Sequence, residues 1–223
     1  MKYFGFIILT PSLGRMRTWF HSHIRGDNGR HLGIINTEGQ TWTNQRRFAL
    51  KELRDLGFGR KSLDTVMVEE VDGVLDDMIK GQSDKVIIDN TFNIAIINVL
   101  WQIVASKRFD PEAADTQRMM YLLNMQFKTG FSILNFIPLL KKLMPFSEND
   151  QSLLDMKKMM RGLIHDHLED IDYDHPRDFI DVYLREMHLN KNSGFDLEHL
   201  VVICLDFFQA GAETTRFVIN LSL

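Results

Sequence analysis

DFFQAGAETT, residues 206–215, follows an apolar run and places a glycine, an acid and two threonines close together in one predicted helix. Asp196 is placed as the N-cap of that helix, and Phe195 and Leu200 are placed as its hydrophobic staple. The stretch LVVICLDFF, residues 200–208, is apolar on nearly every side, which is typical of a helix in the middle of a protein. We therefore predict a buried helix that begins after Asp196 and continues through residues 206–215.

The residues that interrupt this helix favour a binding site. Gly211 lies inside the helix, where a glycine costs about 1 kcal/mol relative to alanine and indicates that something approaches the backbone closely. Thr214 stands four residues after Ala210, so its hydroxyl can bond to the Ala210 carbonyl and open a notch in the helix. Glu213 brings a proton donor or acceptor to the same turn. Together they favour a flat cofactor with a proton-delivery site, and close packing against another helix is the alternative.

The remaining apolar residues recur with the period of an α-helix and are numerous enough for one core. The chain has 223 residues, of which 44% are hydrophobic and 25% are charged, with neither an internal repeat nor a clear domain boundary. Long helices are predicted over residues 63–79, 87–104, 117–131 and 147–168, and a shorter helix is predicted with Pro176 near its first position. The apolar face of the first is expected to consist of Val66, Val71, Val74, Leu75, Met78 and Ile79. These elements predict a mainly α fold in a single unit.

The residue types present exclude several kinds of site. Cys204 is the only cysteine, so an internal disulfide and every cysteine-based zinc motif are excluded. His165 and His167 are two residues apart on a predicted helix and point in different directions, so they are not expected to bind a metal together. The apolar run near the start, residues 3–9, is far shorter than the roughly 20 residues that span a membrane. The sequence thus predicts no metal-binding pair and no membrane-spanning segment.

Charge is distributed unevenly along the chain. Residues 1–61 contain 11 Lys and Arg against 4 Asp and Glu, which leaves +7, whereas 15 against 26 in the remainder leaves −11. A basic segment of this kind attracts nucleic acid, an acidic membrane or an acidic protein. The arginines are mixed with Leu, Phe and Trp at helical spacing and form no nucleic-acid-reading motif, so nucleic acid is not expected as a partner. An ordinary solvated helix face is the simpler alternative to an acidic partner.

AGAETT, at residues 210–215, resembles the distal-helix signature of the haem-thiolate cytochrome P-450 monooxygenases. GQTWTNQRRF, at residues 39–48, resembles the C helix of the same family, whose Trp-x-x-x-Arg pattern is matched by Trp42 and Arg46. Further matches in the expected order are LRDLGFGRKSLD at 53–64, SKRFD at 106–110, HPRDFIDVYL at 175–184 and FDLEHLVVICL at 195–205. Together they resemble the microsomal, animal-type branch, and the resemblance covers the chain from about Leu32 onward.

This resemblance implies the helical portion of the cytochrome P-450 fold, from before the C helix to the distal helix. The family's cysteine loop, Phe-x-x-Gly-x-x-x-Cys-x-Gly, and its Glu-x-x-Arg helix do not occur in these residues, and most of the β-rich subdomain is not expected either. Residues 1–223 are therefore expected to form one partial domain without a metal ligand of their own. Cys204 lies on the distal helix, apart from that loop, and is expected to pack in the core.

Haem is the cofactor that the resemblance implies, and the resemblance assigns its propionates to Trp42 and Arg46. These two residues share one face of a helix, where an indole N–H and a planar guanidinium suit carboxylates. The simpler alternative is a cation–π contact between the two side chains themselves.

The same resemblance assigns the oxygen chemistry to the distal helix. Ala210 and Gly211 are expected to border the oxygen site, and Glu213 and Thr214 are expected to relay protons as the catalytic residues. The implied reaction is a monooxygenation, in which one atom of O₂ is inserted into a small apolar organic substrate with electrons from NADPH. Those electrons are expected to arrive through a reductase that binds the basic surface.

The complete protein is expected at the endoplasmic reticulum membrane, held by an N-terminal anchor that these residues lack. The chain alone is expected to be inactive, because the haem-ligating cysteine loop lies outside it. A second hypothesis is a non-catalytic, truncated product that acts only as a helical binding or regulatory module. A Glu-x-x-Arg helix and a cysteine loop further along the transcript would favour the enzyme.

Overall fold

The computed structural model describes residues 23–80, 88–128, 148–191 and 194–222. Within these ranges the chain is helical and forms no β-strand, which confirms the predicted mainly α fold. The helices are α1 (Gly39–Asp55), α2 (Ser62–Lys80), α3 (Ile88–Ala105), α4 (Ala114–Lys128), α6 (Glu148–Asp170), α7 (Phe179–Leu189) and α8 (Leu197–Ser222). The predicted long helices coincide with α2, α3, α4 and α6 apart from a few terminal residues, of which 87, 129–131 and 147 lie outside the described ranges.

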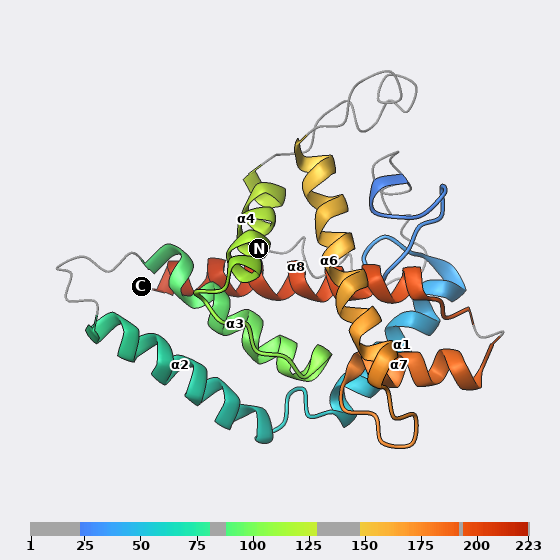
Figure 1. The fold of residues 1–223 in the computed structure, drawn as a ribbon, viewed down its shortest axis with the longest axis horizontal. Helices are drawn as coiled ribbons and strands as arrows, with labels where there is room; N and C mark the ends of the chain where they lie inside the picture. The colour runs from blue at the N-terminus through green and yellow to red at the C-terminus, as the bar shows by residue number, and fades with distance from the viewer. Residues whose placement is uncertain (1–22, 81–87, 129–147, 192–193, 223) are drawn as a thin grey trace.

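α8 runs through the middle of the molecule, as Figure 1 shows. It begins as predicted, because the His199 backbone N–H donates to Asp196 Oδ1 at 2.8 Å. Residues 200–206 and Phe208 are buried, and the helix contacts α3, α6 and α7, of which α3 makes the most extensive contact. The near-continuous apolar sequence of α8 follows from this central position, since neighbours cover it on several sides.

Trp101 is at the centre of the contact between α3 and α8. Its side chain is fully buried, and its ring meets Phe208 edge to face with 5.2 Å between the ring centroids. Phe109, which follows α3, lies 6.0 Å from the indole on another side. Ile97 and Val104, about one turn before and after Trp101, are buried on the same helix. Apolar burial therefore joins these two helices.

α1 is attached to the rest of the molecule through α7. The Phe48 ring of α1 meets Tyr183 and Phe195 edge on, with centroid distances of 5.6 and 4.9 Å. The buried Tyr183 hydroxyl donates to Gln45 Oε1 at 3.0 Å. Aromatic packing and a directional hydrogen bond together fix how α1 is rotated about its own axis.

α7 begins later than the sequence predicts. Pro176 is not at its first position, because the helix starts at Phe179 with Asp178 as the N-cap. The Asp178 carboxylate accepts from the Asp181 N–H at 3.0 Å. A side-chain cap satisfies one of the N–H groups that the first turn leaves unpaired, and this local hydrogen bond decides where the helix begins.

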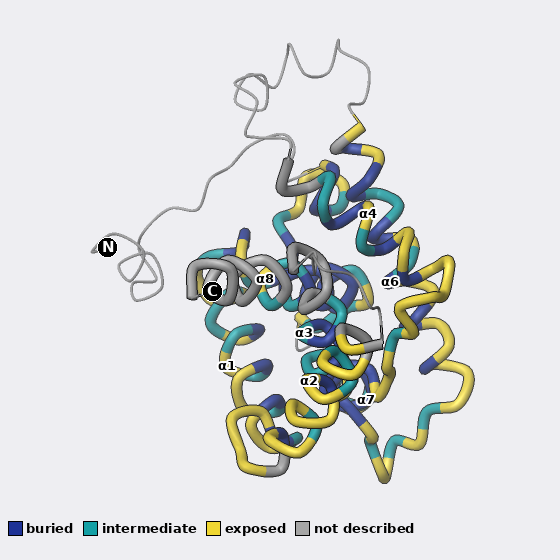
Figure 2. Tube along the Cα trace, turned by 90° about the vertical axis from the view of Figure 1, so that its left-hand side faces the viewer, coloured by how far each residue is buried: buried dark blue, intermediate teal, exposed yellow. Residues whose placement is uncertain are grey.

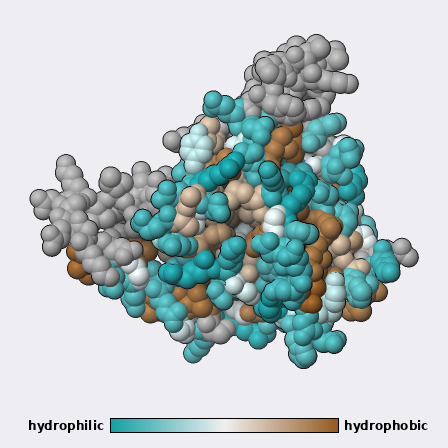
Figure 3. Space-filling view, in the orientation of Figure 1, coloured by the Kyte–Doolittle hydropathy of each residue, from teal (hydrophilic) through white to brown (hydrophobic). Residues whose placement is uncertain are grey.

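α2 forms where the sequence predicts it, but much of its apolar face is exposed. Val71, Leu75 and Ile79 are 44%, 46% and 76% exposed. Most of α2 is coloured as exposed in Figure 2, and hydrophobic side chains lie over this helix at the lower left of Figure 3. The reason is that the contact of α2 with α3 leaves much of this face uncovered. Periodicity thus predicts the helix correctly, but it does not tell whether the apolar face of the helix is covered.

In the described part of the chain, none of the helices combines the length and the apolar character that crossing a bilayer requires. Cys204 is fully buried in α8, and burial raises the pKa of its thiol. This cysteine therefore packs in the core, as predicted.

Trp101→Ala is expected to lower the free energy of unfolding by about 3–5 kcal/mol, because it leaves a cavity between α3 and α8. Trp101→Phe should be less destabilising, since the indole N–H has no acceptor among the described residues. Tyr121→Ala, at a side chain that is 62% exposed, is the control. Urea unfolding followed by circular dichroism measures all three variants. Equal losses for Trp101→Ala and Tyr121→Ala would contradict the central position of Trp101.

Candidate functional site

Trp42 and Arg46 lie one turn apart on the same face of α1. The central carbon of the Arg46 guanidinium is 5.3 Å from the centre of the Trp42 ring, so the cation–π contact considered from the sequence is present. Both side chains are half-buried. Contact with the ring restricts the guanidinium, which reduces the side-chain entropy that is lost when an anion binds.

An open hollow of about 370 Å³ extends along this face of α1. Its lining residues are Trp42, Thr43, Arg46, Arg47, Leu50, Lys51 and Arg54. Four of these seven side chains are cationic and none is acidic. Such a concentration of positive charge suits an anion, and guanidinium groups bind carboxylates through two parallel hydrogen bonds. The α1 face can therefore hold a carboxylate-bearing ligand.

Gly211 lies where α8 crosses α3. A Cβ atom added to this glycine would be 2.8 Å from Cδ2 of Leu100 on α3. The glycine therefore allows the two helices to approach closely, which is the packing alternative considered from the sequence. Ala210, its neighbour, is exposed, so the described residues leave space on that side of the helix.

Glu213 and Thr214 belong to α8, but their side chains lie outside the described part of the structure. Their role as proton relays stays a prediction. The predicted site residues thus fall into one group on α1 and one on α8, and both of these helices contact α7.

Asp206 anchors the segment that precedes α1, a role that the sequence reasoning missed. The residue is 3% exposed, and its carboxylate is paired with the Arg25 guanidinium. Asp206 Oδ2 also accepts from the backbone N–H groups of Ile34 and Ile35 at 2.5 and 3.0 Å. The signal in the sequence was the single charge inside the apolar run of residues 200–208, because a buried carboxylate requires partners.

Gly33 lets this segment approach α8. Its φ is +80°, and a Cβ atom there would lie 2.5 Å from Asp206 Oδ2 and 2.7 Å from Val202 Cγ1. The Gly33 N–H donates to His199 Nδ1 at 3.3 Å. Burial lowers the pKa of His199, which keeps that nitrogen unprotonated and able to accept.

Lys157 of α6 holds the same segment from another side. Its Nζ donates to the carbonyl oxygens of Gly26 and Ile24, at 2.7 and 3.4 Å. Lys157 is 3% exposed, and its pKa is lowered by burial and by the neighbouring Arg161. Buried polar groups of α6 and α8 therefore fix residues 24–35 together.

The family model described as cytochrome P450 matches residues 12–223. The chain belongs to the cytochrome P450 family. The farnesoate epoxidase of Bombyx mori is 30% identical over 83% of this chain, and cytochrome P450 2J3 of Rattus norvegicus is 33% identical over 95% of it. Cytochrome P450 2C8 of Homo sapiens is 31% identical over 86%. The resemblance drawn from the motifs is confirmed, including its microsomal branch.

The chain spans about two fifths of the length of these cytochromes P450, namely 39%, 43% and 41%. Its helical structure is consistent with a part of the cytochrome P450 fold. Within that part, the α1 face supplies cationic groups, and α8 supplies the helix that carries the AGAETT motif.

Asp206→Asn is expected to lower the free energy of unfolding by about 3–5 kcal/mol, because it leaves Arg25 buried without its counter-charge. Asp72→Asn, at an exposed position of α2 away from this segment, is the control. Urea unfolding gives both values, and hydrogen exchange of residues 24–35 should accelerate only in Asp206→Asn. Unchanged exchange there would contradict the anchoring role.

Proposed function

We propose that this chain is part of a haem-dependent monooxygenase, which inserts one atom of O₂ into a small apolar organic substrate. Membership of the cytochrome P450 family supports this class of reaction. The observation that carries the proposal for this chain is the cationic hollow beside the Trp42–Arg46 pair on α1. Its positive charge suits a cofactor that carries carboxylates.

The residues of α1 fit the propionates of haem. Arg46 can bind a propionate through two parallel N–H groups, and the stacked Trp42 ring holds the guanidinium in place. The family resemblance assigns the Trp42 indole N–H to the propionates as well. When bound, haem supplies an iron centre for the reductive activation of O₂.

The iron ligand in this proposal is the cysteine of the family's loop rather than Cys204. Cys204 is fully buried in α8, and burial raises the pKa of its thiol. A thiol that stays protonated and enclosed by apolar side chains is a poor metal ligand. The proposed activity therefore belongs to a form of the protein that carries the cysteine loop.

We infer that α8 leaves room for the cofactor and supplies protons to the reaction. The small side chain of Ala210 leaves room for a flat ligand near the backbone, and Gly211 beside it lets α8 lie close to α3. Thr214 donates the proton of its Oγ1 hydroxyl, and the Glu213 carboxyl resupplies it.

NADPH-derived electrons need a protein partner, and the exposed surface of α1 supports an acidic one. The exposed cations are Arg47, Lys51 and Arg54 on α1, and Arg60 and Lys61 in the connection that follows it. Opposite charges steer two proteins together and orient them, and the effect weakens with salt. We infer that an NADPH-dependent reductase docks here, and that the complete protein is held at the endoplasmic reticulum membrane by an N-terminal anchor.

Arg46→Leu is expected to weaken haem binding by about tenfold to a hundredfold in a form of the protein that carries the cysteine loop, because a charge-assisted hydrogen bond is lost. Arg47→Leu, which removes the same charge from the adjacent exposed position, should leave haem binding almost unchanged. An absorbance titration with haem measures both. Equal affinities in the two variants would remove the support for a cofactor on α1 and favour the non-catalytic helical module.

Thr214→Ala is expected to keep haem binding and to lower the amount of product formed per NADPH consumed, because the hydroxyl proton is lost. Reduced oxygen should then leave as hydrogen peroxide. Thr214→Ser keeps a hydroxyl and should retain most of the coupling. If alanine gives the same ratio of product to NADPH as the unaltered residue, Thr214 is a packing residue only.

A further inference from the structure

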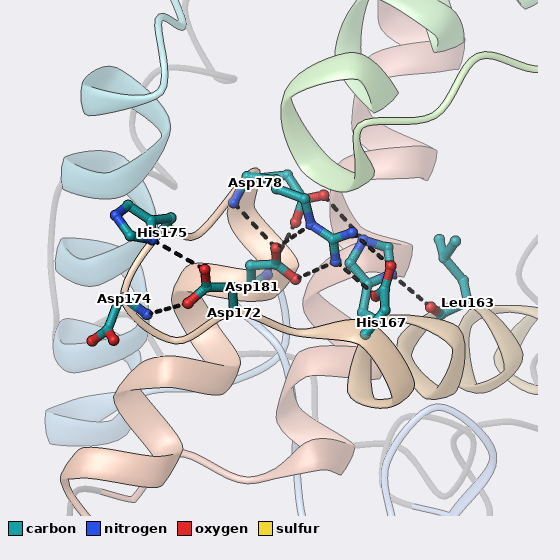
Figure 4. Close-up of polar contacts among 9 residues, drawn as sticks. Leu163, His167, Asp172, Asp174, His175, Asp178 and Asp181 are labelled. Carbon is teal, nitrogen blue, oxygen red and sulfur yellow. Dashed lines mark hydrogen bonds and ion pairs between the residues drawn. The ribbon is translucent and has the colours of Figure 1, made fainter.

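A buried histidine joins the end of α6 to the start of α7. His167 lies in the last turn of α6, and Asp178 is the N-cap of α7. Both side chains are buried. Figure 4 shows His167 between Leu163 on one side and Asp178 on the other, with Asp181 close by. The proposed monooxygenase reaction uses none of these residues.

The two ring nitrogens of His167 both face oxygen atoms that only accept hydrogen bonds. Nδ1 is 2.8 Å from the carbonyl oxygen of Leu163, and Nε2 is 3.0 Å from Asp178 Oδ2. A carbonyl oxygen and a carboxylate have no proton to donate. Either neutral tautomer of His167 would therefore place one nitrogen lone pair against an acceptor. Only the doubly protonated imidazolium satisfies both contacts.

The Asp178 carboxylate serves both helices at once. One oxygen receives the imidazolium, while the other accepts from the Asp181 N–H at 3.0 Å and caps α7. The positive ring lies at the C-terminal end of α6, and the carboxylate lies at the N-terminal end of α7. Both positions are favoured by the helix dipoles. The last turn of one helix and the first turn of the next are thus held by a single ion pair.

The surrounding charges also favour the protonated ring. Asp181 is fully buried and is paired with Arg177, which also bonds to Asp170. If His167 were neutral, Arg177 would be the only counter-charge among the described residues that bonds to this group of carboxylates. The other titratable groups facing the pair are Asp166 on α6, Lys107 after α3 and the Cys204 thiol of α8.

A metal ion is a weaker explanation of this cluster. One potential ligand atom from each of His167, Asp178 and Asp181 lies within 4.8 Å of the others. Each of these side chains already has a protein partner, however. Asp181 receives the backbone N–H and the side-chain Nε of Arg177, at 3.1 and 2.7 Å. A metal would have to displace the helix cap and an arginine, whereas a proton displaces nothing.

Water can reach the pair although it is buried. A hollow of about 220 Å³ borders His167 and Asp178, and Ser106, Lys107, Asp166 and Asp170 are among its other lining residues. Several charged side chains line this hollow, so water can enter it and carry protons to and from the ring. Proton exchange at His167 therefore does not require the helices to separate first.

We propose that His167 and Asp178 form a proton-operated latch between α6 and α7, which is closed when both ring nitrogens carry a proton and opens when one proton is lost. Opening leaves Asp178 to cap α7 alone and frees the last turn of α6. The latch joins two larger parts of the molecule, because α6 holds the segment before α1 through Lys157, while α7 holds α1 itself through Tyr183.

The direction of the pH effect follows from the change in the pKa of His167. Burial alone lowers this pKa, but the hydrogen bonds to Asp178 and to the Leu163 carbonyl outweigh burial and raise it above the ordinary value of 6.5. The stabilisation is therefore fully present below about pH 6.5 and is lost as the pH rises through the pKa of the folded state. Alkaline conditions open the latch.

The first test is direct observation of the ring in the 223-residue chain labelled with ¹⁵N-histidine. We expect His167 to show two protonated ring nitrogens at pH 6 and to lose one with a midpoint above 6.5. His165, which is exposed on the same helix and lies outside the latch, serves as the internal reference. A single protonated nitrogen on His167 at pH 6, or a midpoint at or below that of His165, would overturn the latch.

The second test is hydrogen exchange of the last turn of α6 and the first turn of α7, corrected for the intrinsic effect of pH. Between pH 6 and pH 9 the protection of these amides should fall by about tenfold for each unit by which the folded-state pKa of His167 exceeds 6.5. In Asp178→Asn, which keeps a good N-cap but removes the charge, this pH dependence should disappear. His165→Gln should behave like the unaltered chain. Protection that is independent of pH in the unaltered chain would refute the proposal. Unchanged pH dependence in Asp178→Asn would refute it as well. If Asp178→Asn does not fold, the titration of the His167 ring decides alone.

Discussion

The burial of α8 is the constraint on which the rest of this structure depends. Nearly all side chains from Leu200 to Phe208 are buried, so α3, α6 and α7 all pack around this helix. Apolar burial is strong but not directional, and by itself it would let neighbouring segments slide. The hydrogen bonds and the ion pair of Asp206 fix the position of the neighbouring segment, because a buried carboxylate needs donors at defined places. α8 therefore sets both the core and the path of the chain that enters α1.

Buried charged or ionisable side chains act as specific links between the packed helices. Asp206 joins α8 to residues 24–35, Lys157 joins α6 to the same segment, and His167 joins α6 to α7. In a medium of low dielectric constant such groups are costly unless fully paired, so each link tolerates few alternative geometries. The packing of α1 on α7, which is itself linked to α6, then fixes the position of the basic face of α1.

The parts of the structure that were predictable are those encoded within one helical turn. The N-cap at Asp196 and the shared face of Trp42 and Arg46 depend on residues three or four positions apart, and both are present. The burial of the α2 face was not predictable, since periodicity reports that a helix has an apolar side but not whether a neighbour covers it. The role of Gly211 was predictable only in part. The sequence indicated a close approach to the backbone, and only the structure identified Leu100 of α3 as the group that approaches.

The sequence by itself determined the helical class and the cytochrome P450 family, because local periodicity and short motifs carry that information, and it predicted which residues face a cofactor. Only the tertiary structure decided which charges are buried together. Arg25 and Asp206 are 181 positions apart in the chain, and His167 and Asp178 are separated by a turn that the sequence does not define. No local pattern relates such residues, since their partnership arises only when the helices pack and water is excluded from between them.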